Sequence, residues 1–294
     1  MEFIPAKQIL SSYQQNNNWF ATNYTMNIYK GCCHGCIYCD SRSSCYQVEN
    51  FDTVRAKKDA LMLLEKELRG KRNKGVVGTG AMSDPYNPFE KKYKLTRGAL
   101  ELLCHHRFGV AIATKSPLIE RDIDILSEMK KHTPVLVKIT ITTSDDNLAK
   151  KIEPNVALPS RRLEVISQLS KAGIYTGILL MPVLPFIEDS DENIRDILHL
   201  AKENGSRFVF PLFGLTLRDN QREYFFEQLD QHFPGMKQKY ISEFKNAYEC
   251  RSNRANQLWQ LLKYECDQLS IIYKMQEIIQ SYQGKYKNEQ LSLF

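Results

Sequence analysis

The chain has 294 residues, of which 43% are hydrophobic and 25% are charged, and this is an ordinary composition for a globular protein. No apolar run approaches the ~20 residues of a membrane-spanning helix, and the first residues lack the pattern of a signal peptide, so we expect a cytoplasmic protein without membrane contact. The formal net charge of +6 permits a nucleic-acid partner, and in a reducing compartment the eight cysteines are expected to bind metal or do redox chemistry rather than form disulfides.

Apolar, β-rich segments alternate with helical patterns through the first two thirds of the chain. Strands are expected at residues 23–29, 75–80, 109–115, 135–143, 174–182 and 207–213. Helices are expected at residues 51–70, 96–106, 118–131, 160–173 and 190–205. Near-continuous apolarity is typical of buried parallel strands, and repeated β/α units favour a parallel sheet with helices outside. Six units are too few for a complete eight-stranded barrel, so we expect an α/β fold, a partial (β/α)6 barrel of the TIM type.

The pattern changes near residue 220, where further helical segments are rich in Tyr, Phe and Gln. Four parts of the chain are therefore expected: an N-terminal extension (1–21), a core barrel (22–218), a small helical appendage (219–284) and a tail (285–294). Cys250 and Cys266 of the appendage are interpreted as core residues, because lone cysteines at helical spacing usually pack in a core.

Four cysteines fall within the stretch GCCHGCIYCD, residues 31–40, just after the first expected strand. Cys32, Cys36 and Cys39 give the spacing C-x3-C-x2-C, whereas a start at Cys33 gives C-x2-C-x2-C. In a barrel of this kind the chemistry gathers at the carboxyl ends of the strands, and the cysteine run lies at such an end.

The cysteines also allow two other interpretations. A ferredoxin-type run that starts at Cys33 would need a fourth cysteine at position 43, which is Ser43. A structural zinc site needs four ligands, and Cys45 could supply the fourth. The second interpretation would make the protein a zinc-stabilised, non-catalytic DNA-binding protein.

The C-x3-C-x2-C spacing, with Tyr38 directly before the last cysteine, resembles that of radical S-adenosylmethionine (SAM) enzymes. Several stretches together resemble the subfamily of spore photoproduct lyase and the relatives labelled DNA-repair photolyases, namely residues 27–43, 83–97, 112–126, 152–166 and 177–187. The resemblance implies that Cys32, Cys36 and Cys39 bind a 4Fe-4S cluster, whose open iron binds SAM. Reductive cleavage of SAM would then generate a 5′-deoxyadenosyl radical, with electrons from a flavodoxin- or ferredoxin-type donor.

The same resemblance implies a set of residues that bind SAM or support its site: Tyr38, Ser83, Asp84, Lys115, Ser144 and Arg162. Tyr38 would contact the adenine end, Ser83 and Lys115 the methionine part, and Ser144 the ribose or the carboxylate. Asp84 would not contact SAM itself but would support the residues that do.

Local structural roles are the alternative for some of these residues. Ser83 and Ser144 could cap strand ends, and Glu153 and Arg162 could pair with each other. Lys115 has the stronger case for a functional role, because a lysine at the end of a buried strand needs a partner.

The chain departs from the lyase pattern at two positions. Asp40 stands where the lyase has a tyrosine, and Ala81 stands where the lyase has the cysteine thought to return a hydrogen atom to the product radical. The hydrogen donor and the substrate therefore stay unassigned, with Cys33 as a candidate donor. We expect DNA repair or DNA modification, with RNA or a peptide as the alternative substrate.

The chain ends in QLSLF, that is Gln290, Leu291, Ser292, Leu293 and Phe294. This ending resembles the short peptide by which bacterial polymerases and repair proteins bind the sliding clamp. Apolar anchors on a polar terminal segment suit docking into a hydrophobic pocket, although the same side chains could pack on the protein's own helices.

Overall fold

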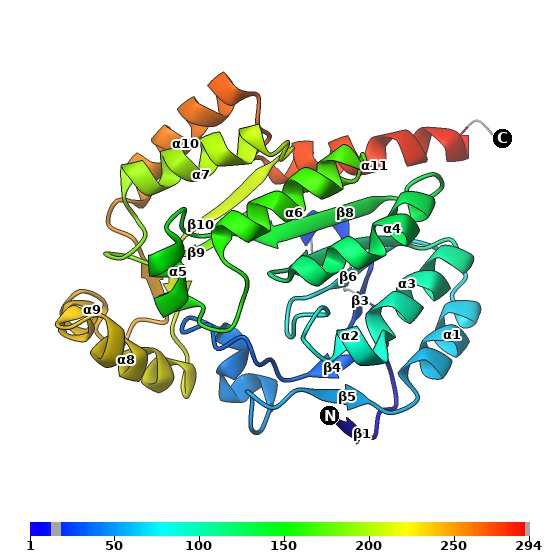
Figure 1. Cartoon of the computed structure of the whole chain (residues 1–294), viewed down its shortest axis with the longest axis horizontal. Coiled ribbons are helices and arrows are strands. Elements are labelled where there is room, and N and C mark those ends of the chain that lie inside the picture. The colour runs from blue at the N-terminus through cyan, green and yellow to red at the C-terminus, as the bar shows by residue number, and fades with distance from the viewer. Residues whose placement is uncertain (13–18, 292–294) are drawn as a thin grey trace.

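An eight-stranded sheet forms the centre of the molecule (Figure 1). The structure, a computed structural model, describes residues 1–12 and 19–291. Six parallel strands form the middle of the sheet: β3 (Tyr24–Met26), β6 (Val76–Thr79), β7 (Gly109–Thr114), β8 (Val135–Thr140), β9 (Tyr175–Val183) and β10 (Val209–Thr216). Two antiparallel strands form its edges: β2 (Leu10–Ser12) beside β3, and β11 (Glu249–Arg251) beside β10. Among the described residues the edge strands do not pair with each other, so the expected α/β fold with a parallel sheet is confirmed and the sheet is open, as in a partial barrel.

Helices cover the outer face of this sheet (Figure 1). They are α1 (Ala60–Gly70), α3 (Leu95–His105), α4 (Ile123–Met129), α6 (Pro159–Lys171) and α7 (Asp191–Glu203). Successive side chains of a strand point to opposite faces. In β8, Val135, Val137 and Ile139 accordingly pack in the main core under the helices, whereas Leu136 faces the barrel interior.

The sequence-based boundaries were wrong in three places. The helix expected from residue 51 begins only at Ala60, because residues 55–57 form β5 (Arg55–Lys57). The alternation of buried and half-buried residues over Val54–Lys57 is that of a strand. β5 pairs with β1 (Glu2–Ile4) and with β4 (Tyr29–Lys30), so the strand expected at 23–29 is divided into β3 and β4.

The third error lies in the appendage, where helices were expected throughout. Its helices are α8 (Gln221–His232), α9 (Met236–Phe244), α10 (Ala255–Leu269) and α11 (Met275–Leu291), but β11 interrupts them and adds to the sheet. Cys250 and Cys266 are fully buried, as expected. Helix α11 also includes residues that were expected to form a tail, since it runs from the appendage through residue 285 to Leu291.

Helix α11 closes the end of the barrel interior at which the strands begin. Ile278 and Tyr282 pack there with Leu136, Phe208 and Phe20. Tyr282 Oη donates a hydrogen bond to the carbonyl oxygen of Phe20, which lies in the short 3-10 helix Trp19–Ala21. In the part of the chain that the structure describes, no helix is long and apolar enough to cross a membrane.

Candidate active site

The cysteine loop, residues 31–40, lies where the carboxyl ends of the parallel strands meet. Ser83, which follows β6, donates its hydroxyl hydrogen bond to the carbonyl oxygen of Gly31. Ile37 N donates to Ile152 O at 2.9 Å, and Asn155 N donates to His34 O at 3.1 Å. Segments that follow β6 and β8 therefore hold the loop, which is the location predicted from the sequence.

Backbone geometry fixes the start of the cysteine loop. Gly31 has a φ of 81°, and a Cβ atom there would lie 2.4 Å from the carbonyl oxygen of Thr53. Cys32 N donates to Phe51 O at 2.8 Å. A side chain at position 31 would collide with the backbone of Thr53, so only glycine lets the two backbone segments lie this close together.

Helices α8 and α9 hold the other side of the loop. Cys36, Ile37 and Tyr38 share a buried cluster with apolar residues of both helices and of the strand end before them: Leu215, Leu217, Phe225, Leu229 and Tyr240. Gln221 Nε2 donates to Tyr38 O at 3.2 Å, and Tyr224 Oη donates to Gly35 O at 3.4 Å. The appendage thus takes part in building the site.

Cys36 and Cys39 belong to the buried cluster under α8 and α9, and Cys33 lies outside that cluster. Burial is the main cause that raises the pKa of Cys32 and of Cys36. The negative charge of Cys39 also raises the pKa of Cys32, and the charges of Cys39 and Cys32 also raise the pKa of Cys36. Cys33 instead packs against the main core, and the charges that act on its thiol are those of Asp84 and Asp52. This arrangement fits the C-x3-C-x2-C register.

Three cysteine thiols without a fourth partner beside them are the donor set that a 4Fe-4S cluster with one open iron would need. Among the described residues, no group of three or more His, Cys, Asp or Glu side chains is placed to hold one metal ion. A cluster needs a different geometry, because each thiolate binds a different iron. Cys45 is exposed, and its Sγ accepts from Arg218 Nη1 at 3.0 Å. Cys32, Cys36 and Cys39 would hold the cluster, with one iron left open.

Lys115 supplies positive charge beside these thiols. Burial raises the pKa of Cys36 and of Cys39, and the Lys115 ammonium is the largest influence that lowers it. Burial opposes the charge of Lys115 itself, but the Cys36 thiolate and the Glu153 carboxylate outweigh it and raise the pKa of Lys115. Lys115 thus offsets part of the effect of burial, which on balance keeps the pKa of Cys36 and Cys39 above its usual value, and so favours the thiolate form that metal binding requires.

Glu153 connects three of the residues that the resemblance assigned to SAM. Its carboxylate accepts from Arg162 Nη2 and Tyr38 Oη, and Lys115 Nζ lies 3.9 Å from its Oε1. Burial raises the pKa of Glu153, but the charges of Arg162 and Lys115 and the two hydrogen bonds have the larger opposite effect. The pKa of Glu153 is therefore lower than its usual value. The alternative that Glu153 and Arg162 pair with each other is confirmed. Arg162 and Tyr38 are buried, so they fix Glu153, which in turn orients Lys115.

Asp84 positions the strand end that carries Lys115. Its carboxylate accepts from Tyr86 N at 2.8 Å, from Thr114 Oγ1 at 2.7 Å and from Lys115 N at 2.8 Å. Ser144 bonds α7: its amide donates to Asn193 Oδ1 at 3.0 Å and its hydroxyl donates to Asp196 Oδ2 at 3.5 Å. Ser83 and Ser144 thus both bond segments distant in the sequence, and their assignment to SAM stays a prediction.

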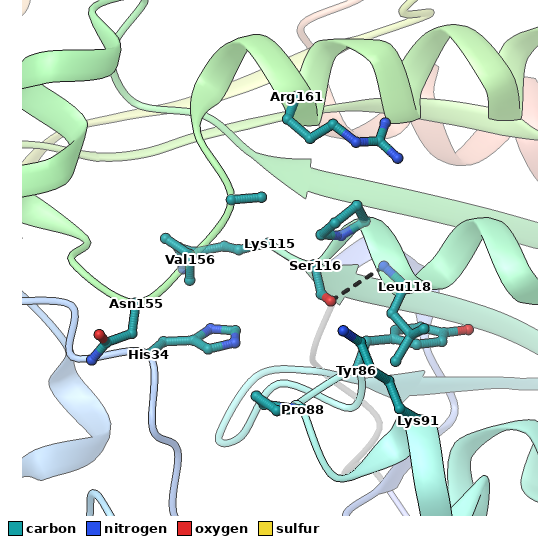
Figure 2. A pocket seen from close by; sticks show the side chains of 12 residues that line it. His34, Tyr86, Pro88, Lys91, Lys115, Ser116, Leu118, Asn155, Val156 and Arg161 are labelled. Carbon is teal, nitrogen blue, oxygen red and sulfur yellow. Dashed lines mark hydrogen bonds between the residues drawn. The ribbon is translucent and has the colours of Figure 1, made fainter.

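A cavity of about 370 Å³ adjoins the cysteine loop (Figure 2). His34 and Asn155 lie on one side of it, Tyr86 and Ser116 lie on the other, and Lys115 also lines it. Cavities of this size bind small molecules. Lys91 and Arg161 add positive charge to its wall.

Two residues near the site were missed in the sequence. His34 lies inside the cysteine loop, with its Nδ1 3.7 Å from Asp84 Oδ2, and burial lowers its pKa. Its position between the cysteines was a usable signal. Glu188 is buried and accepts from Leu184 N at 2.9 Å, and burial raises its pKa to about 8. It follows β9 with no local pattern that marks it as part of a site.

Comparisons with known proteins agree with this geometry. The family described as the radical SAM superfamily matches residues 26–201. An uncharacterized protein of Mycobacterium tuberculosis is 31% identical over 232 residues, which cover 76% of this chain and 67% of the relative. An uncharacterized protein of Methanocaldococcus jannaschii is 30% identical over 213 residues, which cover 72% of this chain and 76% of the relative.

The fold is also that of a solved structure. Spore photoproduct lyase complexed with dinucleoside spore photoproduct is similar with a TM-score of 0.67 at 12% identity, over 91% of this chain and 79% of the other. The family match, the fold and the cysteine loop at the carboxyl ends of the strands lead to one assignment. The chain belongs to the radical SAM superfamily.

Proposed function

We propose that the protein is a radical SAM enzyme that acts on DNA, in repair or in modification. The observation that carries this proposal is the loop of Cys32, Cys36 and Cys39, held against Lys115 at the carboxyl ends of the parallel strands. When bound, the 4Fe-4S cluster and SAM would supply a 5′-deoxyadenosyl radical that takes a hydrogen atom from the substrate. The protein's own task is to bind, to orient and to exclude water.

The residues around the cysteine loop divide this task. Lys115 would bind the SAM carboxylate, because its half-buried ammonium lies beside Glu153 and lines the cavity. Asp84 holds the backbone of Lys115, and Arg162 with Tyr38 holds Glu153. Helices α8 and α9 cover the loop and shield it from water.

Three features support DNA as the substrate. The sequence motifs resemble the spore photoproduct lyase subfamily, the fold is similar to that lyase, and the net charge is +6. Lys91 and Arg161 on the cavity wall suit contacts to phosphate. Ala81, in the place of the lyase's hydrogen-donating cysteine, favours a lesion or a product that differs from that of the lyase.

The proposal is tested with protein reconstituted with iron and sulfide under anaerobic conditions. We expect an electron paramagnetic resonance signal that SAM perturbs, and slow release of 5′-deoxyadenosine that ultraviolet-irradiated DNA accelerates by about tenfold. Matched assays contain undamaged DNA, RNA or a peptide mixture. Acceleration by RNA or peptide alone would favour the alternative substrate class, and one tightly bound zinc without iron uptake would favour the zinc interpretation.

We further propose that the C-terminal QLSLF recruits the enzyme to the bacterial sliding clamp. Gln290 and Leu291 are the last residues of α11, and Ser292, Leu293 and Phe294 lie outside the described residues. Replacing Leu293 and Phe294 together by alanine should weaken capture of the chain by purified clamp at least tenfold, because anchor side chains dominate such interfaces. Asn288→Ala is the matched control. Equal capture of both variants would exclude clamp binding through this segment.

A further inference from the structure

Lys138 is a lysine in the middle of an otherwise apolar strand, and it faces the barrel interior. It lies in β8, where Val137 and Ile139 on either side of it point into the main core under the helices. Because side chains alternate along a strand, Lys138 points to the same side as Leu136, which packs on Phe20 and Phe208 inside the barrel.

The two strand partners of Lys138 are small. In the sheet register it pairs with Ala113 of β7 and with Gly177 of β9. Ala113 is only half-buried although it lies in a central strand, so the interior is open at this level. Lys115 follows Ala113 by two residues, directly after the end of β7, which places it about one layer (~7 Å) nearer the carboxyl ends. Lys138 therefore lies one layer below the lysine assigned to SAM.

No described residue neutralises the charge of Lys138. The side chain is 3% exposed, and its Nζ lies 4.5 Å from the ring centroid of Phe20. Within the described chain it makes no hydrogen bond or ion pair. The titratable side chains of the interior cluster around it are Tyr175 from β9 and Tyr282 from α11, and no charged group of the described residues shifts the pKa of Lys138.

Burial of the Lys138 amine without a counter-ion destabilises its charged form. Burial alone lowers the pKa of Lys138 to about 7. A buried cation without a counter-ion is unfavourable, and a single aromatic ring compensates for little of that cost. An anion that enters from the open interior would supply the missing partner and raise the pKa again.

We propose that Lys138 is a substrate-binding residue that holds a phosphate group of the substrate inside the barrel. The inference rests on the proposed function, since it takes the phosphate to be that of a nucleic acid. Phe210 supports it: its ring belongs to the same interior cluster, 5.6 Å from the ring of Phe20, and the residue is half-buried. Aromatic rings of this kind stack on bases while a cation holds the backbone.

The test measures the binding of a fluorescein-labelled single-stranded DNA oligonucleotide by fluorescence anisotropy, with the reconstituted protein. Lys138→Met should weaken binding about tenfold and make the dependence of log K on log salt shallower by about 0.7, the contribution of one phosphate contact. Lys202→Met is the matched control, because it removes the same charge from an exposed position on α7. Lys138→Arg should bind as tightly as the native chain at pH 7.

The pH dependence separates a bound phosphate from a general effect of charge. Native binding should weaken as the pH rises from 7 to 9, since the free amine loses its proton in this range. Lys138→Arg should show no such loss, because arginine stays charged. Lys138→Met should melt at the same temperature as the native chain or above it, so that weaker binding cannot come from unfolding. Equal binding by Lys138→Met and Lys202→Met would overturn the inference.

A second measurement distinguishes failure of this inference from failure of the proposed function. Trace acetylation with acetic anhydride, followed by peptide mass spectrometry, reports the reactivity of each amine. Lys138 should react at lower pH than surface lysines, and the oligonucleotide should protect it. Protection by inorganic phosphate without binding of the oligonucleotide would support the phosphate site and count against nucleic acid as the substrate. No reaction of Lys138, or equal reaction with and without both probes, would overturn the inference.

Discussion

Cys32→Ala, Cys36→Ala and Cys39→Ala should each abolish 5′-deoxyadenosine release and reduce the iron content of the reconstituted protein from about four per chain to near background. The reason is the geometry of the loop. The three thiols influence one another electrostatically, and Lys115 acts on Cys36 and Cys39 together. Iron and sulfide analysis, and the electron paramagnetic resonance spectrum after reduction, measure the effect.

Cys33→Ala is the matched control for the cysteine series. Cys33 packs against the main core, so its loss should leave iron content and SAM cleavage unchanged. If Cys33 also returns the hydrogen atom to the product, turnover of DNA would fall while SAM cleavage stays. Loss of the cluster in Cys33→Ala, with retention in Cys32→Ala, would show that the other register binds the metal. Loss of metal in Cys45→Ala would favour a zinc site.

Arg162→Met should lower the free energy of unfolding by about 3–5 kcal/mol, because it leaves the buried carboxylate of Glu153 without its closest cation. The side chains of Arg162 and Glu153 are 1% and 3% exposed. Lys115 is 3.9 Å from Glu153 and can compensate only in part. Chemical denaturation of the purified chain measures the change.

The adjacent residue provides the control for Arg162. Arg161 lies on the same helix, its side chain is 39% exposed, and it pairs with Glu120 near the surface. Arg161→Met should therefore cost less than about 1 kcal/mol. Replacing Glu153 by Gln in the Arg162→Met background should recover part of the lost stability, because the unpaired charge is then removed. Equal losses for the two arginines would contradict the role assigned to the buried pair.

The strands that build the barrel could be predicted because each is a nearly continuous apolar run with many β-branched residues. The cysteine loop could be placed because its spacing is specific and it follows the first of these strands. Lys115 could be singled out because a charged residue at the end of a buried strand needs a partner, and Glu153 supplies that partner.

Other features depend on tertiary contacts that no local pattern records. β5 and β11 have three residues each, too few for alternation to outweigh a neighbouring helical pattern. Ser144 follows a strand of the barrel, as Lys115 does, but Asn193 and Asp196 of α7 engage it instead. Lys138 was present in the sequence as a charge inside an apolar strand, and only its register against Ala113 shows that it faces the interior.

The contact between α11 and the 3-10 helix at Trp19–Ala21 has a consequence for how the chain folds. The hydrogen bond from Tyr282 to Phe20 joins residues 262 positions apart. Contacts between such distant residues form late, because the intervening chain must first become ordered. During synthesis this contact cannot form until the chain as far as α11 has left the ribosome. Until then the ring of Phe20 has no closed pocket, and a nascent chain interrupted before α11 would expose the apolar residues at the base of its barrel to chaperones and proteases.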